Sequence, residues 1–246
     1  MQIILIKILI LLALITPILI LSFDWGKKNY KNLLLFLLIY FVWSFFNSPL
    51  YEGIFGIDFI SSIWNWEGKI FAFIFSILFV FIFRKNISEN NFFTLKQNAK
   101  SLKYTLSVIV LITLLSATFT FFSEEKYELD FDTLAFRLTM PGLDEEFAFR
   151  GLMIAFLLPS LKPAFTVGNL RFGNPAVVVT AFLFGLVHGI SFTYNLPIMF
   201  DYFAFTYTFI FGLIWGWMLL KSRSIVMPVV SHNLNNFVVT LLTMIK

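Results

Sequence analysis

Long apolar runs constrain this chain more than any other feature of its sequence. The first, IILIKILILLALITPILIL, covers residues 3–21 and lacks a small-residue cleavage site, so we expect a retained helix rather than a removed signal peptide. Similar runs recur along the chain, and about 20 apolar residues per helix cross the roughly 30 Å hydrocarbon core of a bilayer. Charged residues make up 13% of the chain, far below the roughly 25% of a soluble domain. The sequence therefore predicts an all-α fold, a polytopic bundle of transmembrane helices.

The runs predict about eight spans in one membrane domain, residues 1–246. Their expected ranges are 2–23, 33–48, 70–83, 104–122, 138–158, 175–196, 198–220 and 224–245. Most Lys and Arg residues fall in the loops after odd-numbered spans, which the positive-inside rule places in the cytoplasm, so both termini are expected outside. The stretch 53–65 is too short to cross and is expected at the membrane interface.

The expected spans differ in their content of ionisable residues. Apart from Lys7, every charged residue or histidine within them lies after residue 130. Residues 1–125 are therefore interpreted as accessory N-terminal helices and residues 130–245 as the functional core.

Composition also excludes several kinds of partner. The net charge of +4 fits the cytoplasmic bias of Lys and Arg, and no basic run is interleaved with aromatic residues as nucleic-acid binding requires. The chain has no Cys, which excludes disulfides and Cys-ligated metals. The acidic segment 123–132 is interpreted as a solvated loop outside the membrane. The expected surroundings are the lipid bilayer, and the sequence carries no signal for an oligomeric state.

Residues 144–151, DEEFAFRG, place three acids and an arginine in a predicted span. Ionisable groups there are costly and usually functional. In an α-helix Glu146 and Arg150 are four residues apart with the acid first, which favours an ion pair between them. Glu145 points about 100° away and stays unpaired, so it is the candidate general base. The alternative is an interfacial charge cluster that caps a helix, and Asp144 has no assigned role.

The two histidines of the chain both lie in predicted spans. His188 shares a helix face with Phe184, and a G-x-x-x-G pair around it lets another helix approach closely. His232 shares a face with Asn236, whose amide offers two donors and one acceptor. For each pair the alternative is an interhelical hydrogen bond without catalytic function.

These features carry more weight together than singly. If the spans run as expected, Glu145, His188, His232 and Asn236 lie at a common depth in the membrane. A carboxylate, two imidazoles and an amide that converge inside a membrane are hard to explain as packing. Such a set is typical of a hydrolytic site.

Three motifs resemble, in order, those of the CPBP family of intramembrane proteases, which includes CAAX prenyl endopeptidases and the Abi group of bacteriocin-processing and bacteriocin-immunity proteins. They are Glu145-Glu146-x-x-x-Arg150-Gly151, Phe184-x-x-x-His188 and His232-x-x-x-Asn236. The resemblance covers about residues 130–245. It implies a multi-pass intramembrane endopeptidase of a bacterial cell membrane, whose substrate is a peptide or membrane protein processed as a CAAX motif, a leader or a bacteriocin.

The resemblance also implies a role for each motif residue. Glu145 and His188 would activate a water for attack on a peptide carbonyl. His232 and Asn236 would donate hydrogen bonds to the developing oxyanion, an interaction that usually contributes most to such chemistry. The supporting residues, which would hold the first motif in place or pack beside the first histidine, are Glu146, Arg150 and Phe184.

A metal is the main alternative within this mechanism. Glu145, His188 and His232 are ligand types found in catalytic zinc sites with an open water position. Zn²⁺ or another divalent metal would then activate the water. However, the chain lacks a compact H-E-x-x-H motif, and Asn236 is a poor zinc ligand. We therefore expect a metal-independent glutamate-type protease that needs no cofactor.

Two other functions fit parts of the pattern. The first is a non-catalytic membrane regulator or bacteriocin self-immunity protein with the same fold, although a scaffold has no need of Glu145. The second is a proton- or cation-coupled transporter that uses the same carboxylate and the histidines as a relay. The chain lacks the repeated halves of many transporters, which makes a protease the better interpretation.

Overall fold

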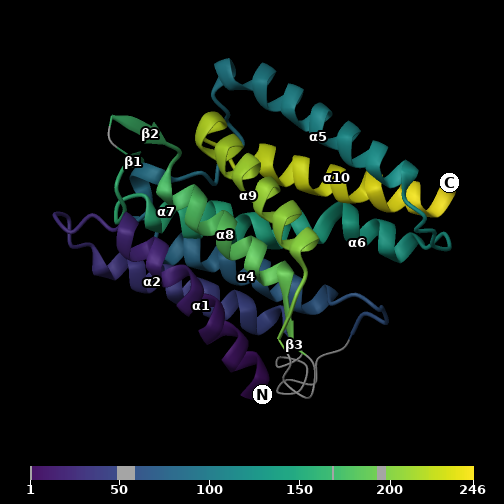
Figure 1. Cartoon of the computed structure of the whole chain (residues 1–246), viewed down its shortest axis with the longest axis horizontal. Coiled ribbons are helices and arrows are strands. Elements are labelled where there is room, and N and C mark those ends of the chain that lie inside the picture. The colour runs from purple at the N-terminus through teal and green to yellow at the C-terminus, as the bar shows by residue number, and fades with distance from the viewer. Residues whose placement is uncertain (1, 49–58, 168, 193–197) are drawn as a thin grey trace.

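The computed structural model describes residues 2–48, 59–167, 169–192 and 198–246 (Figure 1). The longer helices are α1 (Gln2–Ser22), α2 (Tyr30–Phe46), α4 (Trp66–Ile82), α5 (Leu102–Phe122), α8 (Pro175–Gly189), α9 (Tyr202–Ser222) and α10 (Val226–Ile245). One continuous helical segment consists of α6 (Phe131–Pro141), the π-helical η3 (Gly142–Met153) and α7 (Ile154–Leu157). Two single 3₁₀ turns, η1 (Ser88–Asn90) and η2 (Ala99–Ser101), lie between α4 and α5.

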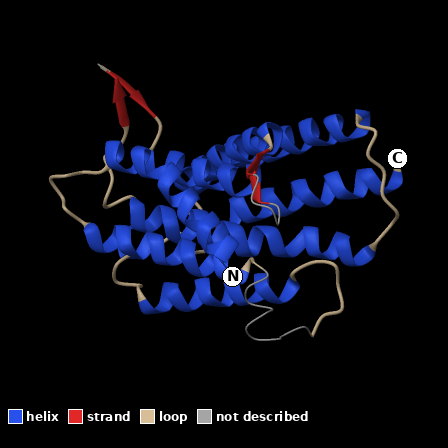
Figure 2. Cartoon of the chain, turned by 60° about the horizontal axis from the view of Figure 1, so that its bottom comes forward, coloured by secondary structure: helices blue, strands red, loops and turns tan. Residues whose placement is uncertain are grey.

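The strands are limited to two short antiparallel hairpins in the described residues. One pairs β1 (Phe165–Val167) with β2 (Leu170–Phe172), and the other pairs β3 (Ile190–Phe192) with β4 (Ile198–Phe200). Figure 2 shows the β1–β2 hairpin projecting from one end of an otherwise helical bundle. The prediction of an all-α fold is confirmed.

Each expected span coincides with a helix, although the bounds differ at several ends. Among the described helices, three are long and apolar enough to cross a membrane: Leu5–Ser22, Ala99–Phe122 and Tyr202–Ser222. Helices α2 and α8 are apolar but shorter. The expected span 175–196 is wrong at its end, because α8 stops at Gly189 and β3 follows. Residues 53–58 of the expected interfacial stretch lie outside the described part, and the number of crossings stays a prediction.

The centre of the bundle is η3, which contacts α2, α4, α6, α8, α9 and α10. Its apolar side chains Phe149, Leu152 and Met153 are fully buried in the core. In Figure 1, α5 and α10 run side by side along one edge, and α1 and α2 lie at the opposite edge. The charged segment DEEFAFRG therefore lies in the interior of the fold and not at its surface.

Helices α8 and α9 pack closely through small residues, as the G-x-x-x-G pair predicts. A Cβ atom on Gly189 would lie 2.6 Å from Cβ of Phe205, and a Cβ atom on Gly185 would lie 3.1 Å from the aromatic ring of Phe205. On α9, Gly212 and Gly216 approach α8 in the same way. This contact fixes the end of α8 that carries His188.

Candidate active site

The segment DEEFAFRG forms part of the π-helix η3, whereas the spacing argument assumed an α-helix. Such segments have i→i+5 hydrogen bonds, are rare and occur often at functional sites. The start of η3 is held by α10, because the Gly142 amide donates to Asn233 Oδ1 at 2.7 Å and the Asn233 amide donates to the Thr139 carbonyl at 3.0 Å. Asn233 thus ties the acidic segment to the helix that carries His232.

The ion pair predicted between Glu146 and Arg150 is present. Arg150 Nε lies 3.2 Å from Glu146 Oε2, and both side chains are fully buried. The other carboxylate oxygen of Glu146 accepts a hydrogen bond from Nδ1 of His232 at 2.9 Å, a contact that the sequence analysis did not predict. The Arg150 guanidinium lies over the Phe184 ring at 4.3 Å and near Trp215 at 5.5 Å. Glu146 therefore connects the buried arginine of η3 to the histidine of α10.

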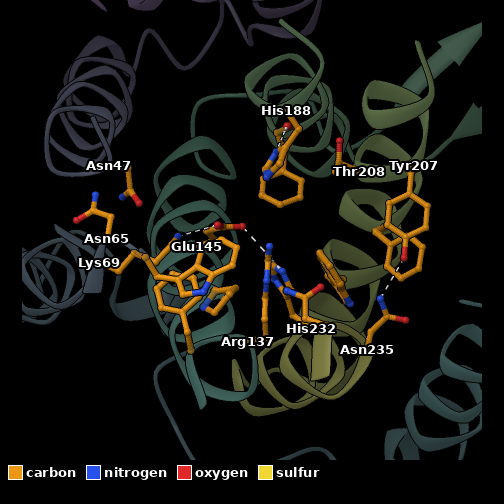
Figure 3. Close-up of a pocket in the computed structure, with 17 residues that line it drawn as sticks. Asn47, Asn65, Lys69, Arg137, Glu145, His188, Tyr207, Thr208, His232 and Asn235 are labelled. Carbon is orange, nitrogen blue, oxygen red and sulfur yellow. Dashed lines mark hydrogen bonds and ion pairs between the residues drawn. The ribbon is translucent and has the colours of Figure 1, made fainter. Parts of the chain in front are cut away.

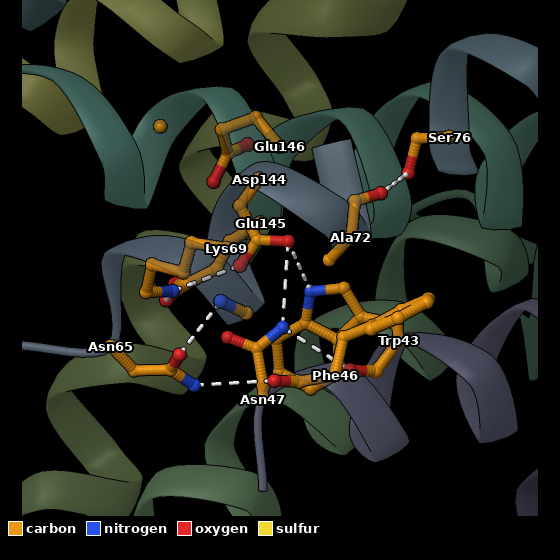
Figure 4. Close-up of polar contacts among 12 residues, drawn as sticks. Trp43, Phe46, Asn47, Asn65, Lys69, Ala72, Ser76, Asp144, Glu145 and Glu146 are labelled. Carbon is orange, nitrogen blue, oxygen red and sulfur yellow. Dashed lines mark hydrogen bonds and ion pairs between the residues drawn. The ribbon is translucent and has the colours of Figure 1, made fainter. Parts of the chain in front are cut away.

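Glu145 is not the unpaired carboxylate that the sequence analysis predicted. Its Oε1 atom lies 2.8 Å from the Lys69 ammonium, and the same ammonium lies 2.8 Å from Asp144 Oδ2. Asp144 is fully buried and also accepts hydrogen bonds from Trp43 Nε1 at 2.9 Å and from Asn47 Nδ2 at 3.5 Å (Figure 4). Asp144, which had no assigned role, is the group on which these three side chains converge.

Lys69 was missed because the expected span began at residue 70, which left the lysine in a loop. Helix α4 begins at Trp66 instead, with Asn65 as its N-cap; the Asn65 side chain accepts the Gly68 amide at 2.8 Å. An asparagine directly before an apolar run is a recognised start signal for a helix. That signal could have placed Lys69 inside the helix, although not beside Glu145.

The two histidines have defined partners at one ring nitrogen each. Nδ1 of His188 lies 2.9 Å from the Phe184 carbonyl; since a carbonyl only accepts, this nitrogen carries the proton and Nε2 is left with a lone pair. Phe184 packs beside His188 as expected, with ring centroids 4.5 Å apart. His232 stacks on Trp215 at 4.0 Å and 14°, and its Nε2 lies 3.9 Å from Glu145 Oε2. Glu145 Oε2 and both Nε2 atoms are thus free of closer protein partners in the described structure.

A cavity of about 320 Å³ brings the predicted residues together. Glu145, His188, His232 and Asn236 all line it, with Phe184 and Trp215 among the apolar wall residues. Figure 3 shows Glu145 between Lys69 and His232, with the His188 ring pointing toward the same space. Glu146 and Arg150 lie behind this wall and do not line the cavity. The cavity is large enough for water and part of a peptide chain.

The proposed metal ligands do not form a metal-binding group in this structure. Within residues 2–48, 59–167, 169–192 and 198–246, no three His, Asp or Glu side chains are arranged to hold an ion. The Lys69 ammonium already occupies one oxygen of Glu145, and a second cation there would be repelled. Glu145, His188 and His232 therefore do not fit a metal as they are arranged, and the metal-free mechanism stays a prediction.

Comparison with known proteins gives one match. Residues 130–238 match the family model described as Type II CAAX prenyl endopeptidase Rce1-like. This segment is therefore similar to the CAAX prenyl endopeptidases, in agreement with the resemblance of the three motifs. The search of the curated proteins and the search of the solved structures each found no match.

The matched segment contains all four predicted site residues, from Glu145 to Asn236. Three contact residues lie outside it: Lys69 in α4, Trp43 in α2 and Asn47 directly after α2. The helices interpreted as accessory therefore supply direct contacts to the acidic residues of the matched segment.

Proposed function

We propose that the chain is an intramembrane endopeptidase that hydrolyses a peptide bond of a membrane-associated protein or peptide. The observation that carries this proposal is the convergence of Glu145, His188, His232 and Asn236 on one cavity. The match of residues 130–238 to the model of Type II CAAX prenyl endopeptidases supports protease activity. CAAX-type processing is the substrate class that this match favours.

In the proposed reaction Glu145 Oε2 takes a proton from a water whose oxygen attacks the peptide carbonyl. This oxygen of Glu145 faces the cavity side of His232 at 3.9 Å, while Oε1 is bound to Lys69. A separation of 3.9 Å between two polar atoms leaves room for a bridging water. The lone pair on His188 Nε2 orients the same water from the opposite wall. The carboxyl proton then passes to the departing amine.

His232 and Asn236 would stabilise the oxyanion that forms on the substrate carbonyl. Nδ1 of His232 already donates to Glu146, so donation from Nε2 requires the imidazolium form, whose positive charge Glu145 and Glu146 offset. The Asn236 amide makes no hydrogen bond to any described residue and lines the cavity. Removal of one such donor typically costs about 10²–10³-fold in kcat.

Lys69 acts in this proposal as a positioning residue. Its contact of 2.8 Å holds Oε1 of Glu145 in place, and its positive charge offsets the charge of the carboxylate. Asp144 holds the ammonium from the other side with support from Trp43. Lys69 touches neither substrate nor water in the mechanism and acts only through Glu145.

The test is peptide cleavage by purified protein in liposomes, with a prenylated C-terminal peptide and a leader peptide as candidate substrates. Glu145→Gln and His188→Ala are expected to abolish turnover while the protein stays folded. Glu128→Gln, which removes an exposed acid of the 123–132 loop, is the matched control. Turnover at the wild-type rate by Glu145→Gln would refute the mechanism and favour the non-catalytic alternative. A strong chelator is expected to leave turnover unchanged, and loss of turnover that added Zn²⁺ restores would support a metal.

A further inference from the structure

The charged side chains around the cavity are paired, with one exception. Lys69 contacts Asp144 and Glu145, and Arg150 contacts Glu146. Arg137 of α6 also lines the cavity, yet it makes no ion pair or hydrogen bond with any residue of the described ranges. Arg137 is half-buried, and the nearby acid Glu145 is already held by Lys69. The guanidinium N–H groups are therefore available to a partner that arrives from outside the chain.

Arg137 is nevertheless held in a defined place. Its guanidinium lies 4.3 Å above the centroid of the Trp64 ring. The Trp64 ring is fixed in turn, because its Nε1 donates to Thr133 Oγ1 at 2.7 Å and its face stacks on Phe136 at 5.0 Å and 16°. A stacked guanidinium keeps its in-plane N–H groups free for a planar acceptor. The arrangement therefore presents several hydrogen-bond donors and a positive charge at the cavity wall.

We propose that Arg137 binds a carboxylate of the peptide substrate, either its C-terminal carboxylate or an acidic side chain near the scissile bond. A guanidinium matches a carboxylate by two parallel hydrogen bonds. The other cation of the cavity wall, Lys69, already contacts two acids. Because Arg137 and Glu145 share one cavity of about 320 Å³, the bound carboxylate lies within a few residues of the bond that is cleaved. This inference rests on the proposed endopeptidase function.

The test compares pairs of peptides that differ only in one carboxylate. One pair has a free or an amidated C-terminus, and further pairs have Glu or Gln at each position flanking the scissile bond. For one of these pairs the wild-type kcat/KM is expected to be at least about tenfold higher for the acid, the size of one lost hydrogen bond to a charged group. The difference should appear in KM, because it reflects binding and not the chemical step.

Variants at the arginine connect this preference to the site. Arg137→Gln is expected to bring the ratio of kcat/KM between the acidic and the neutral peptide of that pair close to one. Arg137→Lys should retain part of this ratio, because lysine keeps the positive charge but cannot donate two parallel hydrogen bonds. Arg84→Gln, which removes an exposed arginine after α4, is the matched control and should retain the full ratio.

Three outcomes would overturn the site. Equal kcat/KM for acid and neutral peptides in every pair refutes it while leaving the proposed function intact. A dependence of KM on anionic phosphatidylglycerol in the liposomes that disappears in Arg137→Gln, without peptide discrimination, would assign Arg137 to a lipid phosphate instead. If the wild type cleaves no peptide, the proposed function fails. The affinities of the Glu145→Gln protein for the acidic and the neutral peptide of each pair then test the Arg137 site independently. Equal affinities in every pair would refute this site.

Discussion

Replacement of Lys69 by methionine tests the most consequential contact of the structure. The change keeps an unbranched side chain of similar length and removes the ammonium that lies 2.8 Å from both Asp144 and Glu145. Two buried carboxylates then lose their common counterion. We expect both the stability and the activity of the protein to fall, for different reasons.

The expected loss of stability follows from the burial of the cluster. The side chain of Lys69 is 12% exposed and that of Asp144 is fully buried, so water compensates little for the missing charge. Removal of one partner from a buried ion pair costs about 3–5 kcal/mol, which corresponds to a decrease in Tm of about 6–20 °C for a chain of this size. Such a loss is a large fraction of the roughly 5–15 kcal/mol by which folded proteins are stable.

The expected loss of activity has its own cause. Without Lys69, the buried carboxyl group of Glu145 takes up a proton in place of its counterion and no longer serves as a base. We therefore expect kcat to fall by about 10²–10⁴-fold, the contribution of a positioned general base, with little change in KM. Lys69→Arg keeps a cation at this place and should retain measurable turnover.

A double variant separates the two effects. Lys69→Met combined with Asp144→Asn removes one positive and one negative charge, so the net charge of the buried cluster returns to its wild-type value. Most of the lost Tm should return, whereas kcat should stay low because Glu145 still lacks its partner. Thermal unfolding in detergent and turnover in liposomes measure the two quantities. Recovery of kcat together with Tm would refute the positioning role and leave Lys69 as a purely structural residue.

Two further predictions concern the helices that carry the site. Asn233→Ala removes the hydrogen bonds to Gly142 and Thr139. It should lower the free energy of unfolding by about 1–3 kcal/mol, because the buried Gly142 amide is left unpaired. Chemical denaturation measures this value, and an unchanged free energy of unfolding would contradict the contact. Gly189→Leu places side-chain atoms against Phe205, where a Cβ alone would approach within 2.6 Å. Such overpacking is expected to lower the free energy of unfolding by about 1–3 kcal/mol. The control is Ile245→Leu, at an exposed position, which should leave the free energy of unfolding unchanged.

Much of the local structure could be predicted from the sequence. The apolar runs predicted a helix in each of the expected ranges, and the four-residue spacing predicted the pair between Glu146 and Arg150. These predictions succeed because both depend on residues that are close in the sequence. The small residues around His188 likewise predicted a close helix neighbour, since a glycine leaves room for the backbone of any helix that packs against it.

The prediction that failed most clearly is that of a free Glu145. Helical spacing describes only neighbours on the same helix, and Lys69 lies 76 residues away on α4. The hydrogen bond that holds the first amide of the π-helix η3 was missed for a related reason, because its acceptor Asn233 lies on α10, 91 residues further along the chain. Neither contact leaves a periodic signal in the sequence.

The sequence by itself determined that this chain forms apolar helices and that three polar motifs lie within them, because hydrophobicity and helical spacing are local properties. Only the tertiary structure decided which charges neutralise one another. Burial in the bundle makes every unpaired charge costly. Lys69 therefore forms ion pairs with Asp144 and Glu145. Glu146 in turn contacts both Arg150 and His232. The same packing leaves Arg137 on the cavity wall, stacked on Trp64 but without an ion pair to any residue that the structure describes.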